Sequence, residues 1–479
     1  MGERLPLTPE EFRALADRVV ELAAGLLADL PTARTFPETS GAEVSAAFDA
    51  PLPEDGLGPA ALDALARVIA LSRPPGPRFF GYVLGSGEPV AALGDLLASV
   101  LNQNVTAWRS SPAAVTIERV VVRWLAEAIR CPDFVGSLTG GGSSANLMAL
   151  AMAREARAPA NVDGVVPGGT VYASSEVHMS IPRAAAVLGL GHAAVRRVPV
   201  DEAFRMDVAA LERAVQEDLA AGRRPIAVVA SAGTVSTGAI DPLAPIAAVA
   251  RRHGLWMHVD GAYGALAALA IPEAFEGLEQ ADSISLDAHK WLYQPLDCGC
   301  LLYRDVGAAQ SAFSHTGDYT RSLLEDPVER FAFFEESLEL SRRFRALKPW
   351  LSLRYHGVRA YRDSIRTDLT LARRLAAAVE ARPELERLAP VSLSAVCFRH
   401  RGDGRRTDAE LDRINQELLL RVVRRGRVYL SNATLRGRFA LRACLVNHRT
   451  TEADVDAVVP EVLGAAGEPI GSPPGFTGS

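Results

Sequence analysis

The sequence has few cysteines and no hydrophobic run long enough to cross a membrane. Its five cysteines are scattered, at positions 131, 298, 300, 397 and 444, and this odd, unpaired set argues against a disulfide framework. The most apolar stretches, residues 184–190 and 226–232, are far shorter than the roughly 20 residues of a transmembrane helix. The N-terminal stretch lacks the apolar core of a secretory signal. We therefore expect a cytoplasmic protein that does not bind membranes.

The sequence also lacks any block of basic residues. Its 51 lysines and arginines are interleaved with 57 acidic residues and leave a net charge of −6, which argues against a nucleic-acid partner. Cys298 and Cys300 have no further ligand residues nearby, so we expect no metal site. With 479 residues, 48% of them hydrophobic, the chain can bury one large core or two to three domains.

From about residue 137, short apolar runs alternate with helical segments. Residues 207–219 carry apolar side chains at helical spacing and end before Gly222, which predicts a helix between two strands. This alternation predicts an α/β fold with a mostly parallel sheet, in which ligands bind at the carboxyl ends of the strands. The expected buried strands are residues 169–173, 226–232, 255–259, 283–286 and 299–303.

The two ends of the chain have different patterns from the middle. Residues 9–30 and 59–72 have helical spacing, and the Pro- and Gly-rich stretch 31–58 between them predicts an extended arm. Near the C-terminus we expect a long helix over 362–381, strands at 391–399, 427–431 and 439–446, and helices at 410–423 and from 451. The predicted parts are an N-terminal helical arm (1–75), a large α/β domain (76–361) and a small α+β domain (362–479).

A lysine, Lys290, stands directly after the predicted strand 283–286. Burial disfavours an ammonium group, so a lysine at this place needs a reason. A neutral, nucleophilic lysine that forms a Schiff base is one reason, and a lysine whose charged end reaches solvent is the other. The neighbouring His289 favours the chemical interpretation.

An aspartate, Asp260, stands at the end of the preceding predicted strand. A buried carboxylate needs a cationic or hydrogen-bonding partner. The nitrogen of a pyridinium ring is such a partner, and an ionised Asp260 would keep that ring protonated. Capping of a helix is the alternative role, and Lys290, thirty residues further on, favours the cofactor role.

Two further segments lie on either side of the predicted strand 169–173. Residues 139–146 combine glycines and hydroxyls before an apolar helix start, which suits one phosphate group, although the lysine of a Walker loop is missing. His178 follows the strand, where an imidazole can stack on an aromatic ring, although a lone histidine is more often structural. Neither segment is specific by itself.

In their order and spacing, the four segments resemble fold-type I enzymes that use pyridoxal 5′-phosphate (PLP). The details are similar to the group II amino-acid decarboxylases, which include aromatic-L-amino-acid, glutamate and cysteine-sulfinate decarboxylases. The lysine signature of that family fits residues 283–290. Other matching segments are residues 78–82, 108–113, 232–234, 342–348 and 440–442, so the resemblance covers about residues 10–460.

The resemblance implies the fold-type I transferase architecture and a role for single residues around the PLP ring. Lys290 would hold the cofactor as a Schiff base, and Asp260 would pair with the pyridine nitrogen. His178 would stack on one face of the ring, and Ala262 would pack on the other.

The same resemblance implies contacts to the PLP phosphate. Gly142, Ser143 and His289 would bind it, and Thr234 would lie near the lysine or the ring hydroxyl. Animal aromatic decarboxylases have an amide at the position of Asp287. An ionised carboxylate cannot donate a hydrogen bond, so we assign Asp287 no phosphate role.

Tyr319 matches the tyrosine of the family's mobile catalytic loop. The resemblance implies decarboxylation of an L-amino acid to the amine and CO2, with Tyr319, helped by His178, protonating Cα. Aldehyde synthases on the same scaffold often carry phenylalanine there, so the tyrosine favours a decarboxylase. The sequence also leaves open an aminotransferase with Arg442 as a carboxylate clamp. A non-catalytic scaffold is disfavoured, because the catalytic set is complete.

The substrate side chain is the least defined feature. Aromatic residues near the expected pocket favour an aromatic L-amino acid, although core or dimer-interface roles would explain them as well. Arg109 could instead face an acidic side chain, and an aliphatic substrate stays open. The candidate substrate-binding residues are Phe80, Tyr82, Thr106 and Tyr355. Family members are homodimers, so the resemblance implies a homodimer whose N-terminal arm wraps the partner.

Overall fold

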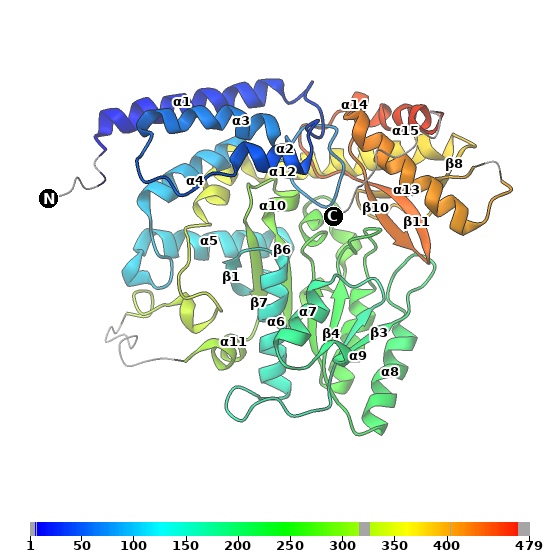
Figure 1. The fold of residues 1–479 in the computed structure, drawn as a ribbon. Helices are drawn as coiled ribbons and strands as arrows, with labels where there is room; N and C mark the ends of the chain where they lie inside the picture. The colour runs from blue at the N-terminus through cyan, green and yellow to red at the C-terminus, as the bar shows by residue number, and fades with distance from the viewer. Residues whose placement is uncertain (1–4, 6, 316–325, 403, 468–479) are drawn as a thin grey trace.

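The computed structural model describes residue 5 and residues 7–315, 326–402 and 404–467. Figure 1 shows three parts: N-terminal helices along the top, a large α/β body below them, and a small α/β lobe beside the helices. Tyr319 lies outside the described residues. The predicted division after residue 361 falls inside one long helix, α12 (Leu347–Glu380).

The large body is built on a seven-stranded sheet with the order β1-β7-β6-β5-β4-β2-β3. Strands β2 to β6 pair in parallel, and β7 runs antiparallel to both β6 and β1. The mostly parallel sheet is therefore confirmed. The strands are β1 (Val135–Thr139), β2 (Gly169–Ser174), β3 (Val195–Val198), β4 (Arg224–Ser231), β5 (Trp256–Asp260), β6 (Ser283–Asp287) and β7 (Gly299–Tyr303).

The five strands that the sequence predicts for the large body are all present, whereas the two edge strands, β1 and β3, were not expected. Central strands are covered on both faces and therefore consist of continuous apolar runs. The edge strands carry polar residues, such as the two arginines in β3, and so lack that signal.

Helices cover both faces of this sheet (Figure 1). The predicted helix at 207–219 is confirmed as α8, whose first turn is capped by Asp207 accepting from the amide of Ala210. The helices of the large body are α4 (Pro89–Leu101), α5 (Pro112–Ala128), α6 (Gly142–Arg157), α7 (Ser180–Val187), α8 (Val208–Ala220), α9 (Leu243–His253), α10 (Ala288–Trp291) and α11 (Val306–Phe313). Short 3-10 turns are η1 (Gly58–Asp63), η2 (Trp108–Ser110), η3 (His192–Ala194), η4 (Ala265–Leu269), η5 (Pro272–Phe275), η6 (Leu278–Gln280) and η8 (Phe333–Glu335).

The N-terminal part contains three helices, of which two were expected: α1 (Pro9–Asp29) and α3 (Ala64–Leu71). The prediction of an extended arm over 31–58 was wrong in part, because α2 (Gly41–Phe48) lies within it. Ser40 and Glu43 form a capping box that starts this helix. A serine followed three residues later by glutamate was the sequence signal for this start.

The small lobe packs α13 (Asp408–Arg425), α14 (Glu452–Asp456) and α15 (Val458–Ala466) on a second sheet of order β10-β11-β9-β8. Its strands are β8 (Leu385–Arg387), β9 (Ala395–His400), β10 (Ser431–Leu435) and β11 (Arg438–Cys444). The strand expected at 427–431 begins only at 431, because Tyr429 pairs with the backbone of Arg78 and Phe80 instead. Gly357, with a positive φ of 74°, divides α12 into two helical segments. The second segment, which begins just after Gly357 and ends at Glu380, corresponds to the long helix expected at 362–381.

All five cysteines are buried and free, which agrees with the prediction that they form no disulfide framework. Among the described residues, no helix has the length and apolarity needed to span a bilayer. The cytoplasmic location stays a prediction.

Candidate active site

A cavity of about 270 Å³ lies at the carboxyl ends of the parallel strands, where the sheet architecture predicts ligand binding. Its volume is near the lower end of small-molecule sites. Every cofactor-binding candidate from the sequence lines it. The lining residues are Gly140, Gly141, Gly142, Ser143, Asn146, His178, Ser231, Gly233, Thr234, Val235, Asp260, Ala262, Tyr263, Asp287, His289, Lys290 and Leu296.

Lys290 faces this cavity, and the chain contains only one other lysine. That residue, Lys348, is fully buried and pairs with Asp95 at 2.9 Å. The Lys290 side chain is 16% exposed, and its Nζ lies 2.9 Å from Asp287 Oδ2. Lys290 is thus the lysine available for covalent chemistry in the cavity.

Asp260 is the last residue of β5, and its carboxylate is held from three directions. Its Oδ2 accepts a hydrogen bond from Asn146 Nδ2 at 3.0 Å. Its Oδ1 accepts from the amide of Ala262 and from Ser285 Oγ, each at 3.2 Å. The carboxylate is therefore fixed as an acceptor in the wall of the cavity.

His178 lies between β2 and α7 and shares the cavity with Asp260 and Lys290. Burial lowers the pKa of His178, and the opposing charge of Asp260 only partly offsets this effect. The imidazole is consequently neutral near pH 7, which suits stacking on an aromatic ring.

The glycines of residues 139–142 lead directly into α6 and open its N-terminus to the cavity. Gly141 is the N-cap residue with φ of 130°, and no side chain caps the helix. A Cβ on Gly142 would lie 2.7 Å from the Cβ of Ala262, so only glycine fits this close approach. Backbone N–H groups of the first turn, with the exposed Ser143 beside them, form a cradle that fits a phosphate.

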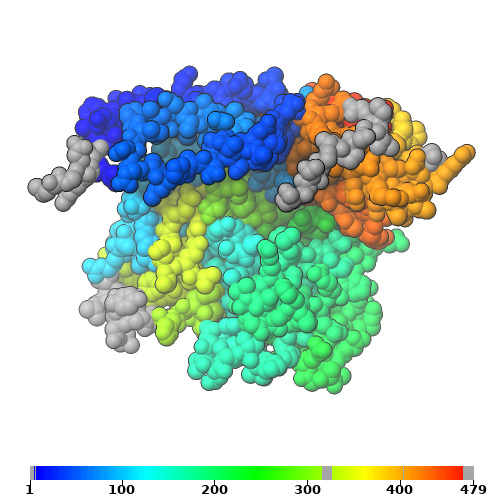
Figure 2. Space-filling model, viewed as in Figure 1, coloured from blue at the N-terminus to red at the C-terminus, as the bar shows by residue number. Residues whose placement is uncertain are grey.

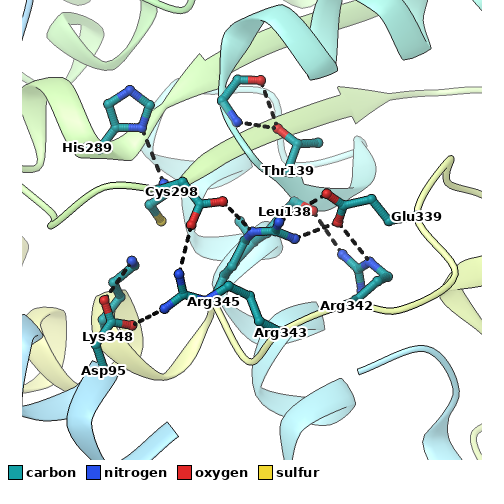
Figure 3. Close-up of polar contacts among 12 residues, drawn as sticks. Asp95, Leu138, Thr139, His289, Cys298, Glu339, Arg342, Arg343, Arg345 and Lys348 are labelled. Carbon is teal, nitrogen blue, oxygen red and sulfur yellow. Dashed lines mark hydrogen bonds and ion pairs between the residues drawn. The ribbon is translucent and has the colours of Figure 1, made fainter. Parts of the chain in front are cut away.

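His289 and Asp287 lie beside this cradle. The amide of Cys298 donates to His289 Nδ1 at 3.3 Å (Figure 3), so Nε2 points to Asp287 Oδ2, 3.5 Å away. Burial lowers the pKa of His289. Asp287 Oδ1 is buried without a hydrogen-bond partner among the described residues. An incoming ligand can satisfy this acceptor, to which the sequence assigned no role.

Thr234 and Ala262 complete the wall of the cavity. The hydroxyl of Thr234 lies 2.9 Å from Thr237 Oγ1 and accepts from the amide of Ala239 at 3.1 Å, so it also stabilises its own turn. Together the covalent lysine, the acceptor Asp260, the neutral His178 and the phosphate cradle fit PLP.

The four substrate-binding candidates are not in the cavity lining. Phe80 is fully buried in the core of the small lobe, which leaves no face for a substrate. Tyr82 is 56% exposed, and its amide donates to Ser431 Oγ at 3.3 Å. Thr106 is half-buried just before η2, and Tyr355 is exposed on α12.

Arg442 lies between the small lobe and the cavity wall. It donates to the carbonyl of Ser236 at 3.1 Å and to Ser431 Oγ at 3.2 Å. Ser431 Oγ also accepts a hydrogen bond from the amide of Tyr82. Through Ser431 and Arg442, Tyr82 is therefore connected to the loop that carries Thr234. Arg109 is exposed on η2.

The cations of the matching segment 342–348 lie outside the cavity lining, and several of them form ion pairs (Figure 3). Arg345 pairs with Asp297 at 2.8 Å and with Glu339, and Lys348 pairs with Asp95. Arg342 pairs with the buried Glu118. The matching segment 342–348 therefore stabilises the fold and does not line the cavity.

Asn146 is a cavity residue to which the sequence analysis assigned no role. It is 1% exposed and contacts Asp260 directly. An amide in the second turn of a helix that follows a glycine loop was the available signal.

Comparison with known proteins agrees with the cofactor that the site geometry fits. The model of the pyridoxal-dependent decarboxylase conserved domain matches residues 64–401. The aromatic-L-amino-acid decarboxylase of Bacillus atrophaeus is 33% identical over 98% of each chain. The phenylacetaldehyde synthase of Petunia hybrida is 31% identical over 92% of each chain. The crystal structure of Oryza sativa TDC with PLP and tryptamine has a TM-score of 0.90 at 28% identity, covering 97% of this chain and 99% of that one.

These matches confirm the resemblance and the fold-type I architecture, and they identify PLP as the cofactor. The chain belongs to the pyridoxal-dependent decarboxylase family and is a PLP-dependent amino-acid decarboxylase.

Proposed function

We propose that this chain converts an aromatic L-amino acid to the corresponding amine and CO2, with Lys290, Asp260 and His178 as catalytic residues. The observation that carries the proposal is the convergence of these three side chains on one cavity with a phosphate cradle. Bound PLP supplies a ring that withdraws electrons from the substrate Cα.

The residues of the chain supply attachment, orientation and proton handling. Lys290 would hold the cofactor through Nζ, because it is the lysine that lines the cavity. Asp260, fixed by its three donors, keeps a proton on the ring nitrogen. His178, neutral because of its burial, covers one face of the ring, and Ala262 covers the other. Tyr319, with His178, delivers the proton to Cα.

The phosphate contacts are proposed to come from the cradle. Gly142 and Ser143 supply N–H and hydroxyl donors at the start of α6, and His289 supplies Nε2–H. Thr234 closes the wall beside Lys290.

The aromatic substrate class rests on the relatives. The Bacillus atrophaeus relative is an aromatic-L-amino-acid decarboxylase. Tyr82, Thr106 and Tyr355 remain the proposed side-chain contacts, whereas the burial of Phe80 argues against a direct role for it. Arg109 keeps an acidic substrate as the alternative, and an aliphatic one also stays open.

We also propose a homodimer. Helix α1 has no buried residue, and α4 exposes a stripe of four leucines and one valine. Contiguous apolar surface of this kind marks an interaction site. The exposed residues of the α4 stripe are Leu93, Leu96, Leu97, Val100 and Leu101. Figure 2 shows the N-terminal helices lying across one side of the molecule, where a partner can contact them.

Light scattering after size exclusion tests the dimer. The expected mass is twice 51.1 kDa, and Leu97→Glu together with Val100→Glu should shift the protein toward the monomer. A monomeric native protein would contradict the proposal.

Product analysis by mass spectrometry tests the reaction. PLP-loaded protein is incubated with aromatic, acidic and aliphatic L-amino acids, beside a Lys290→Ala control whose folding is checked by circular dichroism. Amine and CO2 from the aromatic class, absent in the control, are expected. Product from the acidic or aliphatic class alone would refute the substrate assignment, and an aldehyde with peroxide would favour the synthase alternative.

A further inference from the structure

The buried amide of Asn146 connects Asp260, which would pair with the nitrogen of the cofactor ring, to His178, which would cover one face of that ring. Its Nδ2 lies 3.0 Å from Asp260 Oδ2 and 2.9 Å from Ser180 Oγ. Its Oδ1 lies 2.9 Å from His258 Nε2. All of these groups are buried, so each proton in the network has a definite place.

The carboxylate of Asp260 fixes the orientation of the amide. A carboxylate only accepts, so the amide nitrogen must face Asp260 and the amide oxygen must face His258. His258 therefore donates from Nε2. Burial lowers the pKa of His258 to about 4, and the ring is neutral at pH 7. Its Nδ1 accepts from Ser283 Oγ at 2.9 Å, and that oxygen accepts from Trp256 Nε1 at 2.8 Å.

The second N–H of Asn146 fixes the direction in which the hydroxyl of Ser180 donates its proton. Because Ser180 Oγ accepts this N–H, its own proton points to His178 Nδ1, 2.8 Å away. The backbone N–H of Ser180 also donates to Nδ1, at 3.2 Å. Two donors at Nδ1 require a lone pair there, so the neutral imidazole carries its proton on Nε2.

We propose that Asn146 is a positioning residue, whose amide holds Asp260 directly and, through Ser180, holds His178 as the Nε2–H tautomer. The inference rests on the roles proposed above for Asp260 and His178. In the resting protein His178 then offers a donor, not a base, at Nε2. The same amide couples this donor to the acceptor Asp260.

Nuclear magnetic resonance of 15N-histidine-labelled protein without PLP tests where the protons lie. The chain has nine histidines, and His178→Gln identifies the signals of His178. We expect a protonated Nε2 and an unprotonated Nδ1 at neutral pH. A protonated Nδ1 overturns the proposal. The measurement needs neither cofactor nor turnover, so it is independent of the proposed substrate.

Titration of the PLP-free protein with PLP, followed by visible absorbance, tests the role of the amide. Asn146→Ala removes a hydrogen bond to a charged group and should raise the PLP dissociation constant about tenfold or more. The matched control is Asn415→Ala, an equally buried amide that bonds to His400 in the small lobe. Equal effects of the two substitutions would show a merely structural role and overturn the proposal.

A double-mutant cycle tests the connection through Ser180. Asn146→Ala and Ser180→Ala interrupt the same chain of hydrogen bonds, so the combined variant should raise the dissociation constant by less than the product of the single effects. Effects that multiply fully would mean that Asn146 and Ser180 act independently, and would refute the coupling.

Discussion

Replacement of Arg342 by methionine should destabilise the protein strongly, although Arg342 lies outside the cavity lining. Arg342 is only 2% exposed, and its guanidinium pairs with the carboxylate of Glu118, which is fully buried. It donates to the carbonyl of Val105 at 2.8 Å and to that of Leu138 at 2.9 Å. Glu118 in turn accepts from the amide of Leu138 at 2.9 Å. The two side chains thus bond to backbone groups on the unpaired side of the edge strand β1, and Figure 3 shows the contact of Arg342 with Leu138.

The expected loss follows from the burial of the remaining partner. Arg342→Met leaves the Glu118 carboxylate buried without its cation, which costs about 3–5 kcal/mol of the free energy of unfolding. Arg343 is the matched control, because it is the next residue and also pairs with carboxylates, Asp297 at 3.1 Å and Asp95 at 3.4 Å. Its side chain is 47% exposed, so Arg343→Met should cost less than about 1 kcal/mol.

Urea unfolding of the PLP-saturated protein, followed by tryptophan fluorescence, measures both variants. A third variant, Arg342→Met with Glu118→Leu, removes both charges and should lose less stability than Arg342→Met alone. PLP affinity should fall in Arg342→Met, because Leu138 directly precedes the glycine loop of the phosphate cradle. Equal losses for the Arg342 and Arg343 variants, or a double variant less stable than Arg342→Met, would refute this reasoning.

Three more predictions concern the site and the core. Borohydride reduction of the PLP-loaded protein and peptide mapping should place the pyridoxyl label on Lys290, and a label on Lys348 would contradict the geometry. Burial raises the pKa of Asp368 to about 8, so the folded protein keeps a proton that the unfolded chain releases above about pH 4. The free energy of unfolding should therefore fall as the pH rises from about 4 to about 8. Asp368→Asn should remove this pH dependence and raise the free energy of unfolding by up to about 4 kcal/mol at pH 7. An unchanged pH dependence of the variant in urea titrations would disprove this role of Asp368. Tyr319→Phe should shift the products from amine toward aldehyde and peroxide in the presence of O2, and amine as the sole product would count against the role of Tyr319.

The central strands and the order of site segments could be predicted because their signals are local. A strand buried on both faces needs consecutive apolar residues. Asp260 is the last residue of one such strand, and Lys290 lies three residues beyond the end of the next. The edge strands β1 and β3 could not be predicted in this way, since each has a neighbour on one side only. The helix α2 was missed because its capping box is a two-residue signal within a Pro- and Gly-rich stretch.

Phe80 shows where composition misleads. An aromatic residue beside Tyr82 suggested a substrate contact, yet the amide of Phe80 pairs with the carbonyl of Tyr429. This pairing places the Phe80 ring in the core of the small lobe. Sequence proximity to a site therefore did not decide which aromatic side chain faces it.

The sequence by itself determined the chemistry of this protein: a lysine, an aspartate, a histidine and a glycine loop, each at the end of a strand or the start of a helix. These residue types are recognisable because the strand pattern fixes which end of the sheet they occupy. Only the tertiary structure decided the partners of these groups, since Asn146 is 114 residues from Asp260 and Arg342 is 204 residues from Leu138. Hydrogen bonds at such separations depend on how the chain packs, and no local pattern encodes them.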